Sequence, residues 1–179
     1  MRTFLALNLP LNIKQDIFNL YSEINNSNIK WTSLNNLHIT LKFIGEIEEN
    51  KLAQLRNFLG NNLKLNIINL KIKDTIFFPK FGPPKIIALL GIIDKETNQQ
   101  INQFLKKLNS ELKFIPLDQR SFTPHITLGR IKNFIQKENY QFNYQNNCQI
   151  NTIDLMQSSL TPTGPIYKIV ESYNLTSSI

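Results

Sequence analysis

The chain has 179 residues, 41% of them apolar, and its 20 Lys and Arg against 13 Asp and Glu give a formal charge of +7. This length suffices for one substantial core, and the charge permits a phosphate-bearing partner without choosing between RNA, nucleotide and membrane. The single cysteine, Cys148, excludes an intramolecular disulfide and a cysteine-based zinc cluster, and it fits a reducing compartment.

Alternating stretches of strand-like and helix-like apolar periodicity predict a mixture of strands and helices. In chain order we predict a strand over 3–9, a helix over 13–24, a strand over 37–44, a helix over 52–63, strands over 65–73 and 86–93, a helix over 101–112, a strand from His125, and strand-like segments near 150–160 and 166–175. The predicted fold class is therefore α+β.

Two local details of these elements can be checked against a structure. We expect Asn12 and Gln15 to form a capping pair at the start of the first helix. We expect the segment between the strand at His125 and residue 150 to be a polar connection. No low-complexity linker divides the chain, so residues 1–179 are predicted to form a single domain of two lobes.

Both histidines of the chain open the same tetrapeptide, His-Ile-Thr-Leu, at 38–41 and 125–128. If each tetrapeptide is a strand, alternation places His and Thr on one face and Ile and Leu on the other. The two copies are separated by about half of the chain. This spacing predicts a pseudo-twofold arrangement of two β-rich lobes around a shared groove.

A single His-x-Thr tripeptide is more often the polar face of an ordinary strand, but a duplicated one that includes every histidine favours a functional site. A zinc site is less well supported, because zinc prefers three or four ligands and neither tetrapeptide contains Asp or Glu. A serine-type triad lacks its nucleophile elbow, and no glycine-rich phosphate loop is present. We therefore expect no metal and no cofactor.

Two imidazoles with two hydroxyls suit in-line displacement at phosphorus. Because the ordinary pKa of histidine lies near neutrality, one imidazole can accept a proton while the other donates one. Thr40 and Thr127 can hydrogen-bond the non-bridging oxygens, where negative charge builds in the transition state. His38, Thr40, His125 and Thr127 are therefore the predicted catalytic residues.

These motifs are where the chain resembles the two-histidine (2H) phosphoesterase superfamily, specifically its LigT-like RNA 2',3'-cyclic phosphodiesterases. The segments that resemble the family, in order and spacing, are 2–10, 31–46, 81–91, 122–130 and 160–167. The resemblance implies a bilobal α+β fold in which two antiparallel β-sheets line a central groove, with the helices packed outside. It also implies hydrolysis of a 2',3'-cyclic phosphate, on RNA or a nucleotide, to a 2'-phosphomonoester. It also implies that His38 protonates the leaving 3' oxygen and that His125 activates water.

Two cations beside the motifs are candidate substrate contacts. Lys42 continues the face of the first motif by strand periodicity, although a solvated strand-edge lysine is an equal alternative. Arg130 has the opposite parity from the second motif's histidine, so it reaches the groove only if the strand ends or bulges near Gly129. The aromatic residues that could stack on a base, or else belong to the core, are Trp31, Phe81 and Phe122.

Two alternatives for the function remain open at this point. One is a non-catalytic RNA or nucleotide-binding module that uses the groove as a phosphate cradle. The other keeps the chemistry but applies it to a different substrate, such as 2'-5' RNA linkages that are hydrolysed or ligated. We expect a cytoplasmic protein with no membrane partner, because Asn8 and Pro10 break the N-terminal apolar run before it reaches the length of a signal core or membrane span. We also expect a monomer.

Overall fold

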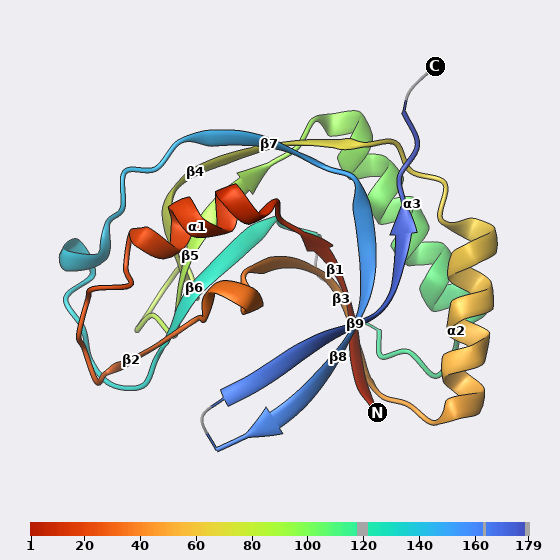
Figure 1. The fold of residues 1–179 in the computed structure, drawn as a ribbon, viewed down its shortest axis with the longest axis horizontal. Coiled ribbons are helices and arrows are strands. Elements are labelled where there is room, and N and C mark those ends of the chain that lie inside the picture. Colours follow the sequence, from red (N-terminus) through yellow and green to blue (C-terminus); the bar gives the residue numbers. More distant parts are fainter. Residues whose placement is uncertain (118–121, 163, 178–179) are drawn as a thin grey trace.

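A curled antiparallel β-sheet forms the middle of the computed structural model, which describes residues 1–117, 122–162 and 164–177 (Figure 1). Its strands are β1 (Arg2–Asn8), β2 (Ile29–Trp31), β3 (His38–Glu46), β4 (Ile68–Phe78), β5 (Ile86–Ile92), β6 (His125–Ile131), β7 (Asn146–Ile150), β8 (Thr152–Thr161) and β9 (Gly164–Asn174). The helices are α1 (Leu11–Asn19), α2 (Glu49–Asn62) and α3 (Lys95–Glu111), with short 3-10 turns η1 (Leu34–Asn36) and η2 (Lys137–Tyr140). The α+β class is thus confirmed.

The order of strands across the sheet brings the two motif strands to its centre. Within the described residues the order is β7-β4-β5-β6-β3-β1-β8-β9, with the short β2 added to β6. Every pair of named strands is antiparallel. Because β3 and β6 are neighbours, the two histidine-bearing segments lie side by side although half of the chain separates them.

The groove was expected to lie between two separate sheets, and here the structure differs. Ile39 of β3 pairs with Ile126 of β6, and this is the one residue pair recorded between those strands. The pair links the two halves into one continuous sheet. On either side of it the strands diverge, which leaves space for a cleft without separating the halves.

Two local expectations were wrong. The first helix begins at Leu11 after Pro10 and has no side-chain cap, so Asn12 and Gln15 are not a capping pair; Gln15 instead donates to the Asn19 side chain. Because Pro10 is the N-cap residue, Asn12 and Gln15 lie inside the helix and not at the flanking position from which a side chain caps it. The expected polar connection after β6 contains η2 and the edge strand β7, whose polar composition reflects its solvated face.

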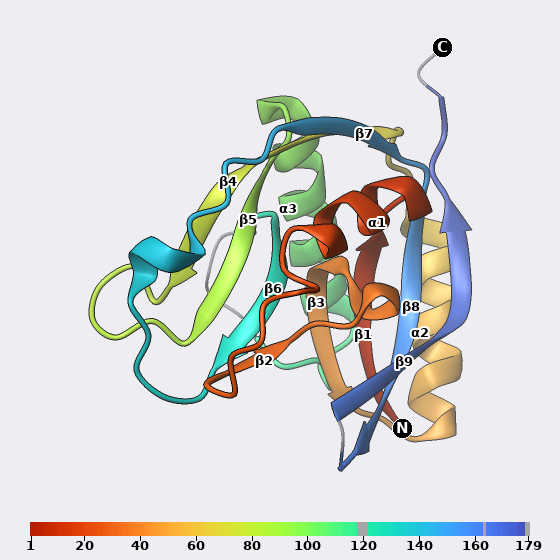
Figure 2. The ribbon, with the colours of Figure 1, turned by 60° about the vertical axis from the view of Figure 1, so that its left-hand side comes forward.

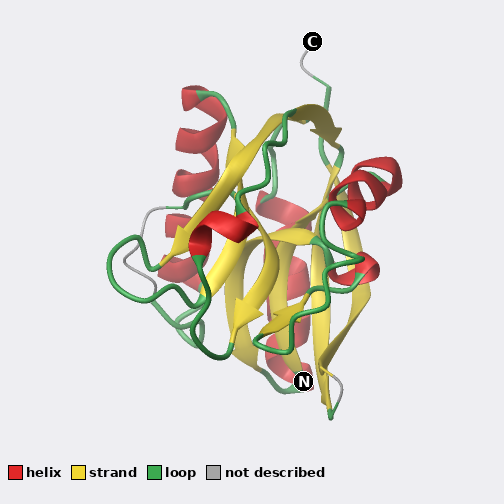
Figure 3. Cartoon of the chain, turned by 90° about the vertical axis from the view of Figure 1, so that its left-hand side faces the viewer, coloured by secondary structure: helices red, strands yellow, loops and turns green. Residues whose placement is uncertain are grey.

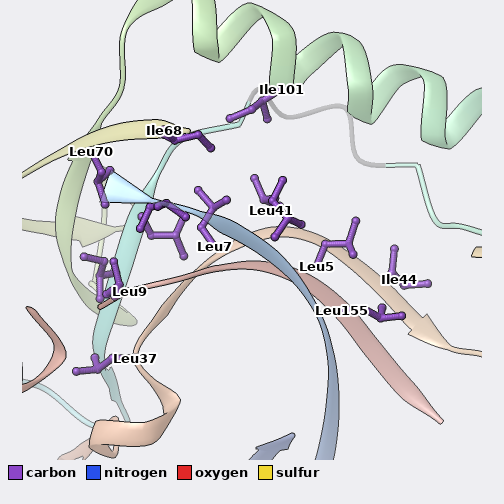
Figure 4. Packing of buried hydrophobic residues seen from close by; sticks show 14 of the residues in the cluster. Leu5, Leu7, Leu9, Leu37, Leu41, Ile44, Ile68, Leu70, Ile101 and Leu155 are labelled. Carbon is purple, nitrogen blue, oxygen red and sulfur yellow. The ribbon is translucent and has the colours of Figure 1, made fainter. Parts of the chain in front are cut away.

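One hydrophobic core connects the sheet with the helices. Figure 4 shows Leu7 near Ile68 and Leu155 near Leu5 and Ile44, with Ile101 of α3 close to Ile68. Helices α2 and α3 lie side by side in Figures 1 and 2. Figure 3 shows the strands in the body of the molecule and the helices around them. None of the helices in the described residues is long and apolar enough to span a membrane.

Candidate active site

The two motif histidines and threonines gather around the central bridge of the sheet. Ile39 and Ile126 occupy the same position in each tetrapeptide, and both are fully buried in the core. Because side chains alternate along a strand, the residues on either side of each isoleucine point to the opposite face. All four predicted catalytic residues line one cleft of about 1500 Å³.

The two motif strands also pair with their outer neighbours in the same way. Thr40 lies opposite Ala6 of β1, and Thr127 lies opposite Ala88 of β5. One residue is skipped in the register after each of these pairs, which places a bulge at the same position of each motif. The backbone around the bridge therefore follows an approximate local twofold symmetry.

Each imidazole is oriented by a main-chain carbonyl two residues earlier in the chain. The distance from Nδ1 of His38 to the Asn36 oxygen is 2.7 Å, and that from Nδ1 of His125 to the Thr123 oxygen is 2.8 Å. A carbonyl only accepts hydrogen bonds, so Nδ1 carries a proton in both rings. This leaves Nε2 of each ring as the nitrogen that can exchange a proton with a bound molecule.

The surroundings of His38 favour its neutral form. Its ring lies 5.1 Å from the ring of Phe4 and 5.3 Å from that of Tyr167. This burial lowers the pKa of His38 from 6.5 to about 4, and electrostatic interaction with Lys14 and with His125 contributes in the same direction. With Nδ1 protonated, neutral His38 accepts a hydrogen bond at Nε2 from the Thr40 hydroxyl, 2.9 Å away.

The bulges change which later residues face the cleft. Lys42 pairs with the core residue Leu5, is 6% exposed, and donates from Nζ to the Pro116 carbonyl at 2.6 Å. The expectation that Lys42 lies on the same face as His38 is therefore wrong, although Lys42 still borders the cleft. Its role as a substrate contact stays a prediction.

The same irregularity in the second motif places Arg130 on the cleft face. The register skips Leu128, so Arg130 regains the face of His125, is exposed, and lines the cleft. The bulge near Gly129 on which the sequence argument depended is thus present. Burial raises the pKa of the Tyr167 phenol, and the positive charge of Arg130 opposes that rise.

The aromatic residues at the cleft that the sequence reasoning missed include Phe43 and Tyr167. Phe43 follows His38 by the same number of positions as Arg130 follows His125, is 58% exposed, and lines the cleft. Only the bulge makes this spacing meaningful, because simple alternation places Phe43 on the opposite face. Tyr167 comes from the distant β9, and no local sequence signal connects it with His38.

The three aromatic candidates of the sequence have different surroundings. Trp31 stacks on Tyr21 and donates from Nε1 to the Ile24 carbonyl, which indicates a structural role for much of its ring. Phe122 is partly buried and borders the cleft. Phe81 is 84% exposed and lies outside the cleft.

The described wall of the cleft is positively charged. It includes no Asp or Glu, whereas five cationic residues border it: Arg2, Lys30, Lys42, Lys106 and Arg130. A cleft with charges of one sign concentrates ligands of the opposite sign. Within the described ranges, no three His, Cys, Asp or Glu side chains cluster closely enough to hold a metal ion. The arrangement therefore suits an anion that exchanges protons with two imidazoles.

Comparison with known sequences identifies related proteins along nearly the whole chain. The family model described as LigT like Phosphoesterase matches residues 7–87 and 90–167. A Methanocaldococcus jannaschii protein named RNA 2',3'-cyclic phosphodiesterase is 30% identical over 181 residues, covering 97% of this chain and all of that protein. An Aquifex aeolicus protein of the same name is 31% identical and covers 82% of this chain and 81% of its own length.

Solved structures share the fold. A crystal structure of a Thermus thermophilus protein has a TM-score of 0.83 at 23% identity, with complete coverage of both chains. Escherichia coli LigT complexed with 3'-AMP has a TM-score of 0.76 at 21% identity, with 98% of each chain covered. At this level of identity the likeness concerns the fold alone.

Proposed function

Because this chain belongs to the LigT-like phosphoesterase family, we propose that it is an RNA 2',3'-cyclic phosphodiesterase that opens the cyclic phosphate to leave a 2'-phosphomonoester. The observation that carries the proposal is the pair of imidazoles, each held through Nδ1 by a carbonyl, with both rings on one cleft whose described wall includes no carboxylate. The names of the family relatives support the choice of an RNA cyclic phosphate as substrate.

The proposed reaction needs one proton acceptor and one proton donor. Nε2 of His125 takes a proton from water as the water oxygen forms a bond to phosphorus. The bond from phosphorus to the ribose 3' oxygen breaks, and Nε2 of His38 donates a proton to that oxygen. The product carries a 2'-phosphate and a 3'-hydroxyl, and exchange with solvent restores the two imidazoles.

The low pKa of His38 puts a condition on this division of roles. In the free protein near pH 7 this imidazole is neutral, because its pKa is about 4. A phosphate anion beside the ring favours the protonated form, so substrate binding itself would supply His38 with the proton that it later donates. The proton donor, protonated His38, is thus formed only when the phosphate is bound beside it. Because the rate needs one proton acceptor and one proton donor, we expect a bell-shaped dependence of the rate on pH.

Neighbouring groups would bind the phosphate and the nucleotide. Thr40 and Thr127 are proposed to donate hydrogen bonds to the non-bridging oxygens. Arg130 is proposed to contact substrate directly from the cleft face. Lys42, whose ammonium is held by the Pro116 carbonyl, would act through its positive charge.

A product assay tests the proposal. Purified protein with EDTA should convert an oligonucleotide that ends in a 2',3'-cyclic phosphate to the 2'-phosphate alone. His38→Ala and His125→Ala serve as controls and should lose this conversion. Formation of the 3'-phosphate would reverse the orientation of the two histidines. Tight binding without ring opening would instead favour a non-catalytic binding module.

We also propose that one chain suffices for the reaction, because all the residues discussed above come from a single chain. Light scattering of the active protein should give the mass of a monomer. Activity confined to a larger species would contradict this.

A further inference from the structure

Three loops meet at one end of the sheet, next to the cleft. The segment 79–85 precedes β5, the segment 132–136 follows β6, and the segment 25–28 precedes β2 (Figure 2). Main-chain hydrogen bonds connect them: the Ile131 amide donates to the Lys85 carbonyl at 2.9 Å, and the Lys132 amide donates to the Asn28 carbonyl at 2.7 Å. We call these three segments the β5–β6 loop surface.

Cations predominate in this region. Residues 25–30, 79–87 and 129–137 contain no Asp or Glu, and the exposed Glu138 directly follows the last of these ranges. The cationic residues in these segments are Lys30, Lys80, Lys85, Arg130, Lys132 and Lys137. All but Lys137 are exposed, and Lys137 lies over the ring of Phe77. Such an excess of cations over carboxylates favours a polyanion as partner.

Two phenylalanines on the same surface are exposed to solvent. Phe81 is 84% exposed and Phe134 is 86% exposed, the largest values among the exposed apolar side chains of the described residues. Exposed aromatic rings interspersed with lysines are the combination by which proteins bind single-stranded nucleic acid: the rings stack on bases and the cations contact phosphates.

The surface continues from the cleft. Lys30, Ile86 and Arg130 line the cleft and also flank the three loops. From His125 to Ile131 the strand covers roughly 20 Å at the usual rise per residue. A single nucleotide whose phosphate lies at His125 cannot extend that far, whereas an RNA chain of a few nucleotides can.

We propose that the β5–β6 loop surface binds the single-stranded RNA that precedes the cyclic phosphate, so that the enzyme prefers an oligonucleotide to a mononucleotide. Phe81 and Phe134 stack on bases, and Lys80, Lys85 and Lys132 contact the backbone. This inference rests on the proposed function, to which it adds the surface that binds the rest of the RNA chain and the preference for an oligonucleotide.

The cleft wall formed by α3 is the alternative path for the RNA, and its charge is less suitable. It offers Lys106 between Asn102 and Asn109. No other cation of α3 lines the cleft among the described residues. Backbone phosphates passing along this wall would therefore meet fewer cations than the β5–β6 loop surface presents.

The test compares two substrates with the same terminal nucleotide, uridine 2',3'-cyclic phosphate and decauridylate ending in a 2',3'-cyclic phosphate. The variants are Phe81→Ala combined with Phe134→Ala, and Lys85→Glu combined with Lys132→Glu. Leu11→Ala is the control for loss of an exposed apolar side chain, since Leu11 is 69% exposed on α1. Lys95→Glu is the control for charge, since Lys95 is exposed and begins α3 beyond the opposite end of β5.

We expect the double phenylalanine variant to raise KM for decauridylate by about tenfold or more, because each base stack contributes a factor of roughly 5 to 100. Its kcat/KM for the mononucleotide should equal that of the wild type. The lysine variant should make decauridylate binding less dependent on salt, by about 0.7 in the logarithmic slope for each lost phosphate contact. The two controls should match the wild type on both substrates.

Equal losses on both substrates, or no loss on decauridylate, would overturn the inference. If the wild type opens neither substrate, the proposed function fails, and fluorescence anisotropy with labelled decauridylate decides the binding question separately. Weaker binding by both double variants than by their controls would uphold the RNA surface even then. Equal binding would refute it.

Discussion

At the scale of single residues, the two imidazoles make the same kind of hydrogen bond through Nδ1 but differ in their surroundings. Both rings are held through Nδ1 by the carbonyl two residues earlier. His38 contacts the rings of Phe4 and Tyr167, whereas His125 contacts the single ring of Phe78. An almost symmetrical backbone therefore supports a chemically asymmetrical pair, which is what a division into acid and base requires.

The stability of the protein should report the low pKa of His38. Between pH 6.5 and 4 the unfolded chain binds a proton at this residue that the folded protein, with a pKa of about 4, does not. The unfolded state then holds more protons, so the free energy of unfolding falls as the pH is lowered, by up to about 3 kcal/mol. Urea denaturation across this range measures it.

The chain offers a matched control, because it has two histidines. His38→Gln should remove this contribution to the pH dependence, whereas His125→Gln should retain it. Identical pH dependence in the two variants would show that burial does not lower the pKa of His38.

The two threonines should matter for the rate and not for folding. Thr40→Val and Thr127→Val each remove one donor to the developing negative charge, which lowers kcat by about 10² to 10³-fold in comparable sites. Steady-state kinetics together with urea unfolding separate the two effects. Thr32→Val, which removes another hydroxyl at the cleft, should leave kcat unchanged. A variant that unfolds readily but retains kcat would mean that its threonine is structural.

At the scale of elements, the two bulges decide which side chains after each threonine face the cleft. Alternation correctly predicted that the histidine and the threonine of each motif lie on one face of the strand, because the register is regular as far as Thr40 and Thr127. It failed for Lys42, since neither Leu41 nor its neighbours indicate a bulge in the sequence. In the second motif Gly129 provides such an indication, and Arg130 was accordingly predicted under that condition.

Gly129 also allows β2 to approach β6. A Cβ atom at this position would lie 2.8 Å from Cγ2 of Ile29 and 2.9 Å from Cε3 of Trp31. Gly129→Ala should therefore lower the free energy of unfolding by about 1 to 3 kcal/mol. Gly60→Ala is the control, because a Cβ there meets nothing within 4 Å in α2 and should stabilise by about 0.5 to 1 kcal/mol. Unchanged stability of Gly129→Ala in urea would contradict the close packing.

At the scale of the whole molecule, the pairing of distant strands was beyond the sequence. The short β2 has three residues and no periodicity of its own, yet it pairs with β6 about a hundred positions later. The edge strand β7 is too polar to distinguish from a loop. The long amphipathic helices and apolar strands were predictable because their periodicity depends on one buried face.

The shared core predicts that the two halves of the sheet unfold together, as a single domain would. The chain has one tryptophan, Trp31, whose fluorescence reports on β2 and β6, while far-UV circular dichroism reports on all elements. The two urea transitions should coincide. Separate midpoints would mean that the halves are independent and that the bridge between Ile39 and Ile126 does not couple them.

Convergence of both imidazoles on one phosphate is most directly measured by nitrogen NMR of the ring Nε2 atoms during titration with adenosine 2'-phosphate. The spectrum is simple because the chain contains two histidines. Both Nε2 resonances should shift together and saturate at one ligand per chain, and His38 should gain a proton as the phosphate binds. A titration that moves one imidazole and leaves the other unchanged would contradict the account.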